Sequence, residues 1–423
     1  MRTPRTALVD TTEYLAEPLG PAATAHLRVT RPGEPVLWAA YARAHYYDLP
    51  GHDEKGQRQK NLLVRGVGGV LGGLVDAAIG SDEGPDRPPP ADVIVFGPGP
   101  DCLAYRYLPP GPHRRQLWTL TPQRLALHVE TVPPDPGGSL LTKAARFGRD
   151  IAKIVTDNRQ SFGANTEGEP VSPMLTEPVF DVPRSEIAGI APGPRGLRVT
   201  LVDGSGLDFL LAMTDREEIE YAAALTNGHP PRRGALVEWA DKAARDSAKR
   251  ARDLAAAVWP DRLVLAGSTN YGHVGLVLAG SQRLPHTPIG EVPELAVGPL
   301  RWPHPATTTT ADNWTEDPVV GFFAQATDPA QDAARFADLL AHTRGVARLM
   351  VTDQRVGLLA AGELVRNPSP LVSVHEVSRA RVARLSAELL GRAIPPRPVL
   401  RLDFTDGSVL WLRDPAAARQ EAG

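Results

Sequence analysis

Apolar and polar residues alternate with a period of two in short segments of this chain. In residues 197–201 and 400–404 every second side chain is apolar, which is typical of a half-buried antiparallel strand. Each segment is followed by Asp-Gly, at 203–204 and 406–407, and glycine readily adopts the positive φ of a tight turn. The pattern therefore predicts antiparallel hairpins at two separate places in the chain.

These hairpins belong to an internal repeat of three blocks. Both copies contain Thr-x-Gln-Arg between two apolar runs, then Val-x-Arg-x-x-Ile/Val, and then an Asp-Gly-Ser hairpin. The offsets between the copies are 231, 195 and 203 residues. Blocks that keep their order while their spacing changes indicate a duplication with loops of different length. The paired blocks are 118–127 with 349–358, 182–190 with 377–385, and 197–205 with 400–408.

Each copy is predicted to be a meander of short antiparallel strands, which makes the fold class mainly β. Closing such a meander into a barrel or an orthogonal sandwich would remove the exposed edges that invite aggregation. Proline (42) and glycine (39) are abundant in the 423 residues, and we assign this surplus to hairpins and loops.

The order of the blocks resembles that of bacterial pleckstrin-homology-like (PH-like) domains, a superfamily that includes GRAM domains. The resemblance covers residues 116–212 and 347–413 closely. It implies small seven-stranded barrels, each capped by a C-terminal helix. It also implies a recognition module more readily than an enzyme, although fold alone does not determine function.

Several further elements follow from the resemblance. Arg31–Leu37 and Ile289–Leu295 are expected to be the opening strands, and Thr214–Ala223 the first capping helix. Only ten residues follow Arg413, so the second capping helix is expected to be very short or to be replaced by another element, for which Gln331–His342 is available. The predicted organisation is an N-terminal segment (1–28), a first PH-like domain (29–228) with insertions at about 51–112 and 130–177, a connecting helix (229–260), a second PH-like domain (261–413) and a tail (414–423).

Composition narrows the class of protein. The chain has 46 Lys and Arg against 49 Asp and Glu, a net charge of −3, which argues against general nucleic-acid binding. One cysteine cannot form an internal disulfide, and neither a secretory signal nor a long apolar span is evident. We therefore expect a cytoplasmic protein, with a peripheral location at the inner face of the membrane as the alternative. The bias toward Ala, Arg, Gly and Pro resembles the composition of actinobacterial proteins.

A basic amphipathic helix is predicted at 140–155. Its apolar residues share one face, opposite Lys143, Arg146, Arg149 and Lys153. Such a helix either covers a core with its charges solvated or lies on an anionic membrane or an acidic partner. The glycine-rich segment 66–80 is compatible with close helix packing or with membrane contact. It lacks the Gly-Lys-Ser/Thr of a phosphate loop.

Arg124 and Arg355 occupy equivalent turns of the repeat. They either stabilise the turn or contact an anion, because a guanidinium suits phosphate. His45–Asp48 is aromatic, which is compatible with a functional role, but a buried strand end is the favoured interpretation.

No catalytic or metal-binding motif is evident, so we predict no catalytic residue, metal or cofactor. The leading hypothesis is a non-catalytic binding or scaffold protein with a protein partner or an anionic surface as its target. The alternatives are a peripheral membrane protein that uses the basic helix, and an enzyme without a recognisable motif.

Overall fold

The structure is a computed structural model. The chain is mainly β, with several sheets, and no sheet closes into a barrel within the residues that the structure describes. These residues are 17–58, 91–111, 114–131, 165–194, 196–211, 213, 216–228, 256, 258–266, 272–283, 287–296, 302–305, 314–343 and 346–413.

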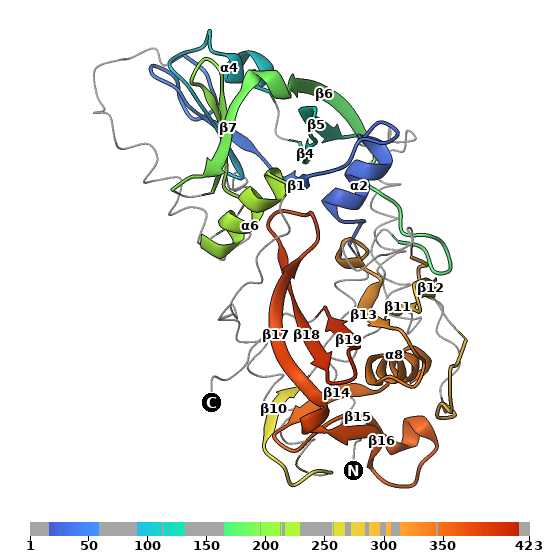
Figure 1. The fold of residues 1–423 in the computed structure, drawn as a ribbon. Coiled ribbons are helices and arrows are strands. Elements are labelled where there is room, and N and C mark those ends of the chain that lie inside the picture. The colour runs from blue at the N-terminus through green and yellow to red at the C-terminus, as the bar shows by residue number, and fades with distance from the viewer. Residues whose placement is uncertain are drawn as a thin grey trace.

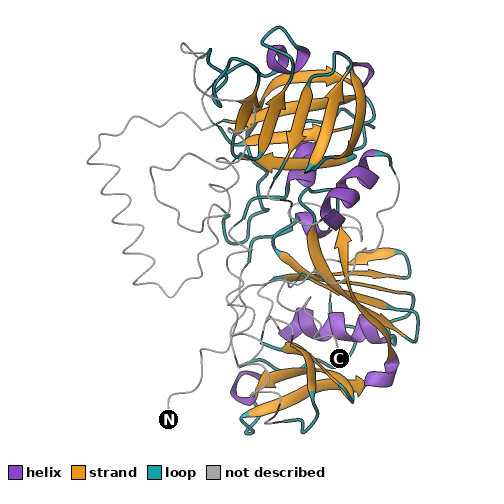
Figure 2. Ribbon diagram, turned by 90° about the vertical axis from the view of Figure 1, so that its left-hand side faces the viewer, coloured by secondary structure: helices purple, strands orange, loops and turns teal. Residues whose placement is uncertain are grey.

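The first unit contains two sheets that share one core (Figures 1 and 2). Their strand orders are β1-β4-β5-β6 and β2-β3-β9-β8-β7. Helix α2 (Pro21–Arg28) precedes the unit, and α4 (Leu103–Tyr107) and α6 (Arg216–Thr226) lie within it. The strands are β1 (Trp38–Ala42), β2 (His45–Asp48), β3 (Val93–Phe96), β4 (Gln116–Leu120), β5 (Arg124–Glu130), β6 (Thr176–Pro183), β7 (Ile187–Pro192), β8 (Leu197–Leu201) and β9 (Gly206–Phe209).

The second unit repeats this arrangement. Its sheets have the orders β10-β14-β15-β16 and β12-β11-β13-β19-β18-β17, and α8 (Asp332–Thr343) lies between them (Figure 2). The strands are β10 (Leu263–Ala266), β11 (His273–Leu278), β12 (Ser281–Arg283), β13 (Val320–Ala326), β14 (Arg348–Thr352), β15 (Arg355–Ala361), β16 (Leu371–Ser378), β17 (Val382–Leu390), β18 (Arg397–Phe404) and β19 (Val409–Leu412).

Removing β12 makes the strand orders of the two units identical. The prediction of purely antiparallel sheets is wrong, because β2 pairs with β3 and β11 pairs with β13 in parallel. Two parallel strands need a crossover connection between them. In each unit the parallel pair adds strands that precede the meander to the second sheet. Part of the range predicted as an insertion, 91–108, therefore contributes β3 and α4 to the repeated arrangement.

The Asp-Gly-Ser hairpins do more than turn the chain. In the first unit Asp203 accepts the backbone N–H of Leu103 (2.6 Å), and Ser205 Oγ accepts that of Ala104 (3.0 Å). Asp406 and Ser408 make the same two bonds, of 2.7 and 3.0 Å, to the first residues of α8. Each hairpin thus caps a helix distant in sequence, satisfying N–H groups that lack a partner inside the helix.

Two predicted opening strands are wrong. Residues 31–37 and 289–295 are not strands, and β1 and β10 open the sheets instead. In the second case Asp338 of α8 accepts the backbone N–H groups of Ile289 and Gly290 (2.9 and 3.1 Å), which holds the segment against the helix. The predicted helix at 331–342 is present as α8, and α6 overlaps the capping helix predicted at 214–223.

A long hairpin fastens the second unit to the first. The strands β17 and β18, red in Figure 1, rise toward β1 and α6. At the tip, Ala39 of β1 donates to the carbonyl of Arg392 and accepts the N–H of Ile394, both at 2.9 Å. The side chains of Leu389 and Ile394 are 4 % and 1 % exposed within the core of the first unit. The second unit therefore completes the core of the first.

Candidate functional site

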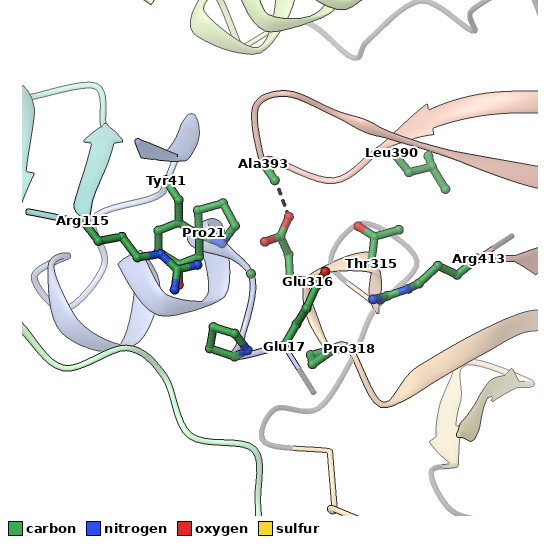
Figure 3. A pocket seen from close by; sticks show the side chains of 12 residues that line it. Glu17, Pro21, Tyr41, Arg115, Thr315, Glu316, Pro318, Leu390, Ala393 and Arg413 are labelled. Atoms are coloured by element: carbon green, nitrogen blue, oxygen red, sulfur yellow. Dashed lines mark hydrogen bonds between the residues drawn. The ribbon is translucent and has the colours of Figure 1, made fainter. Parts of the chain in front are cut away.

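A pocket lies at the junction of the two units (Figure 3). Its volume is about 180 Å³. The first unit and the segment before it contribute Tyr41 and Arg115 with the start of α2, and the second contributes Thr315, Glu316, Arg413 and the hairpin tip. The complete lining is Glu17, Pro18, Gly20, Pro21, Tyr41, Arg115, Thr315, Glu316, Pro318, Leu390, Ala393 and Arg413.

Glu316 holds the two sides of the pocket together. Its carboxylate accepts the N–H of Ala22 in α2 and that of Ala393 in the hairpin tip, each at 3.1 Å, and its carbonyl accepts the N–H of Gly20 at 2.7 Å. Figure 3 shows the bond to Ala393 as a dashed line. A carboxylate is stabilised near a helix N-terminus, and Glu316 is buried there, at 4 % exposed. We therefore interpret it as a structural link between α2 and the hairpin tip.

Tyr41 forms an aromatic wall of the pocket. Its hydroxyl donates to the carbonyl of Leu19 (2.8 Å) and lies 2.6 Å from Thr24 Oγ1. Burial raises the pKa of Tyr41 to about 12, so the phenol stays protonated near neutral pH. Arg115 lies with its Cζ 4.7 Å from the centre of this ring. The pocket thus presents a cation on an aromatic platform.

The arginines of the repeat, Arg124 and Arg355, lie away from the pocket. Arg124 Nε is 3.1 Å from Glu34, and Nη1 is 2.5 Å from Asp181. The bond from Arg124 lowers the pKa of Glu34 to about 2. In the second unit Arg355 lies 2.6 Å from Asp261 and 3.2 Å from Glu376. Two carboxylates around each guanidinium favour the turn-stabilising interpretation, and anion contact stays a prediction.

The four other predicted binding residues, Lys143, Arg146, Arg149 and Lys153, lie outside the described residues, as does the glycine-rich segment 66–80. Their contact with an anionic surface also stays a prediction. Among the described helices none is long and apolar enough to cross a membrane. The described part of the chain also contains no group of three or more His, Cys, Asp or Glu side chains arranged to hold a metal ion.

The aromatic segment that begins at His45 forms a buried network. Gln116 Nε2 lies 2.6 Å from His45 Nδ1, and His45 Nε2 lies 3.1 Å from the hydroxyl of Tyr47. Tyr47 donates to the carbonyl of Leu108 (2.8 Å), and Trp118 donates to Gln116 Oε1 (2.9 Å). These bonds are all satisfied when neutral His45 donates through Nε2. The network is part of a core, as interpreted from the sequence.

Sequence reasoning missed every side chain of the junction pocket. These residues come from separate segments that the docked hairpin and the bonds of Glu316 bring together. One signal was present, because the offset between repeat copies rises from 195 to 203 between the second and third blocks. That difference is the length by which the docking hairpin exceeds its counterpart. A comparison of the chain with protein-family models, curated proteins and solved structures finds no match.

Proposed function

We propose that this chain is a non-catalytic binding or scaffold protein that contacts a protein partner at the junction of two PH-like units. The repeated strand order and the helix α6 after the first meander support the PH-like assignment. The parallel strand pairs and the open sheets depart from the family pattern. The observation that carries the proposal is the pocket built from both units.

The size and chemistry of this pocket favour a macromolecular partner. Its volume of about 180 Å³ is below the roughly 300–1,000 Å³ typical of small-molecule sites. A pocket of this size suits one anchoring side chain of a protein, which is how interface hot spots commonly bind. Tyr41 stays protonated near neutral pH, and the carboxylate of Glu316 accepts two backbone N–H groups. These two side chains therefore stabilise the pocket and are poorly suited to transfer protons.

The test is partner capture with matched variants. Wild type, Arg115→Glu and Arg114→Glu serve as baits in cell extract, and each captured protein is then purified and titrated. Arg114 is the control because it is adjacent, exposed and paired with Glu177 at 2.8 Å. We expect a protein that binds wild type and Arg114→Glu directly and Arg115→Glu at least tenfold more weakly. If every captured protein binds all three baits equally, the proposal is wrong.

A further inference from the structure

We propose that the junction pocket binds a carboxylate group, supplied by an acidic side chain of the partner, and that Arg115 is its main contact. This inference rests on the proposed function and specifies the chemistry of the partner. It depends on three observations, which concern Arg115, Thr315 and three partly buried arginines of the chain.

Arg115 is positioned for a ligand. Its guanidinium lies over the Tyr41 ring, and the described residues provide no hydrogen bond or ion pair to it. The ring is itself fixed by the bonds of its hydroxyl to Leu19 and Thr24. Stacking leaves the N–H edge of a guanidinium available, and that edge matches a carboxylate in a bidentate arrangement. The cation is thus oriented before a partner arrives.

Thr315 provides a second donor in the pocket wall. Its hydroxyl oxygen is buried and has no hydrogen-bond partner among the described residues. A buried hydroxyl without a partner is costly, and a ligand oxygen that came within hydrogen-bond distance would remove that cost. The polar groups of Arg115 and Thr315 that await a partner can both donate, which favours an anion.

Other arginines show what Arg115 lacks. Arg124 and Arg355 each face two carboxylates supplied by the chain itself, and Arg198 makes two bonds of 2.6 Å to Asp208. Arg115 has the aromatic support without the acid. Because Arg115 is also exposed, its guanidinium is accessible to an acid from another molecule.

The opposing consideration is the presence of Glu17 and Glu316 in the lining. Glu316 directs its oxygens at two backbone N–H groups, which offsets part of its charge. A cationic ligand is nevertheless the competing outcome, and the experiment includes it.

The test is nuclear magnetic resonance of protein labelled with ¹⁵N at its seven tryptophans. Trp314 precedes Thr315, and its ring lies 5.6 Å from Arg413 Cζ, so its indole resonance reports on the pocket; Trp314→Phe assigns it. Sodium glutarate is titrated at constant ionic strength against sodium chloride and butylammonium chloride. We expect a saturable shift of Trp314 with glutarate alone.

Variants then identify the contacts. Arg115→Leu is expected to weaken glutarate binding at least fivefold, Thr315→Val about twofold to threefold, and Arg114→Leu not measurably. Unchanged tryptophan resonances without ligand verify that each variant folds. In a second arm, a short peptide with one glutamate is expected to bind more tightly than free glutarate, while its glutamine analogue does not bind.

Each outcome separates the two proposals. Absence of a saturable glutarate shift, or a shift with butylammonium instead, overturns the carboxylate site. The proposed function would still stand if a protein bound wild type and Arg114→Glu but bound Arg115→Glu at least tenfold more weakly. Glutarate binding that depends on Arg115, without any partner that discriminates Arg115→Glu, supports the site and overturns the protein partner. Equal binding by Arg115→Leu and wild type overturns the role of Arg115.

Discussion

The β7–β8 and β17–β18 hairpins are equivalent elements with different roles. Beyond the equivalent pairs Pro192–Leu197 and Ala387–Leu400, the first hairpin has four residues (193–196) and the second has twelve (388–399). The short tip is closed by a bond from Gly193 N–H to Gly196 O (2.7 Å) and leaves Pro192 and Pro194 exposed. The long tip enters the other unit.

The difference shows how two units of equivalent strand order are joined. The side chains and backbone groups that dock on the first unit, at Leu389, Gly391, Arg392, Ala393 and Ile394, all belong to the additional stretch. The rest of the two units remains similar in strand order and in the bonds of its helix caps. The extension of one hairpin therefore supplies part of the wall of the inter-unit pocket, at Leu390 and Ala393.

Shortening the long hairpin should have the largest effect. Replacing residues 388–399 with the Gly-Pro-Arg-Gly of 193–196 removes Leu389 and Ile394 from the first core, and each such loss costs about 2–5 kcal/mol. We expect the calorimetric transition of the first unit to fall and separate from that of the second. Val202→Ala, at a side chain that is 59 % exposed, is the control. A single transition at the wild-type temperature would contradict the fastening role.

A smaller effect is expected at the Glu316 link. A Cβ at Gly20 would lie 2.2 Å from Glu316 Oε2 and 3.0 Å from its Cα, so Gly20→Ala forces a displacement. We expect a loss of about 2 kcal/mol in urea unfolding, typical of overpacking. Gly189→Ala is the matched control because no heavy atom lies within 4 Å of its added Cβ. Equal stability of the two variants would show that the junction yields freely.

Acid should weaken the first unit through Glu34. Its pKa is lowered from 4.5 to about 2 by the hydrogen bond from Arg124, so the unfolded chain binds more protons between these values. Stability should therefore fall as the pH drops from about 5 to about 2, and Glu34→Gln should flatten this part of the curve. Chemical unfolding at stepped pH measures it, and an unaltered slope in Glu34→Gln would disprove the assignment.

The helix caps should give the smallest effect, equal in both units. Ser205→Ala removes the 3.0 Å bond to Ala104, and Ser408→Ala removes the 3.0 Å bond to Ala333. Each is expected to cost about 1 kcal/mol, as for other N-terminal caps. The double variant should show the sum, because distant sites are additive. A loss of stability in only one of the two single variants would contradict the equivalence of the caps.

The sequence predicted the parts of the fold that local patterns specify. Thr121 and Thr352 mark turns because their hydroxyls accept the N–H of the following Arg, at 3.1 and 2.9 Å, a bond within four residues. The parallel pairs could not be predicted in this way, because β3 and α4 have four and five residues and too little periodicity to identify. The pocket depends on contacts such as Glu316 with Ala22, 294 residues apart.

The docked hairpin also affects the order in which the protein matures. The first unit leaves the ribosome well before Leu389 and Ile394, which complete its core. At about 5–20 residues per second of synthesis, the nascent first unit waits on the order of ten seconds for them. During that interval the edge of β1 and the apolar surface on which the hairpin docks are accessible to chaperones. The lifetime of this incomplete form therefore depends on the speed of translation.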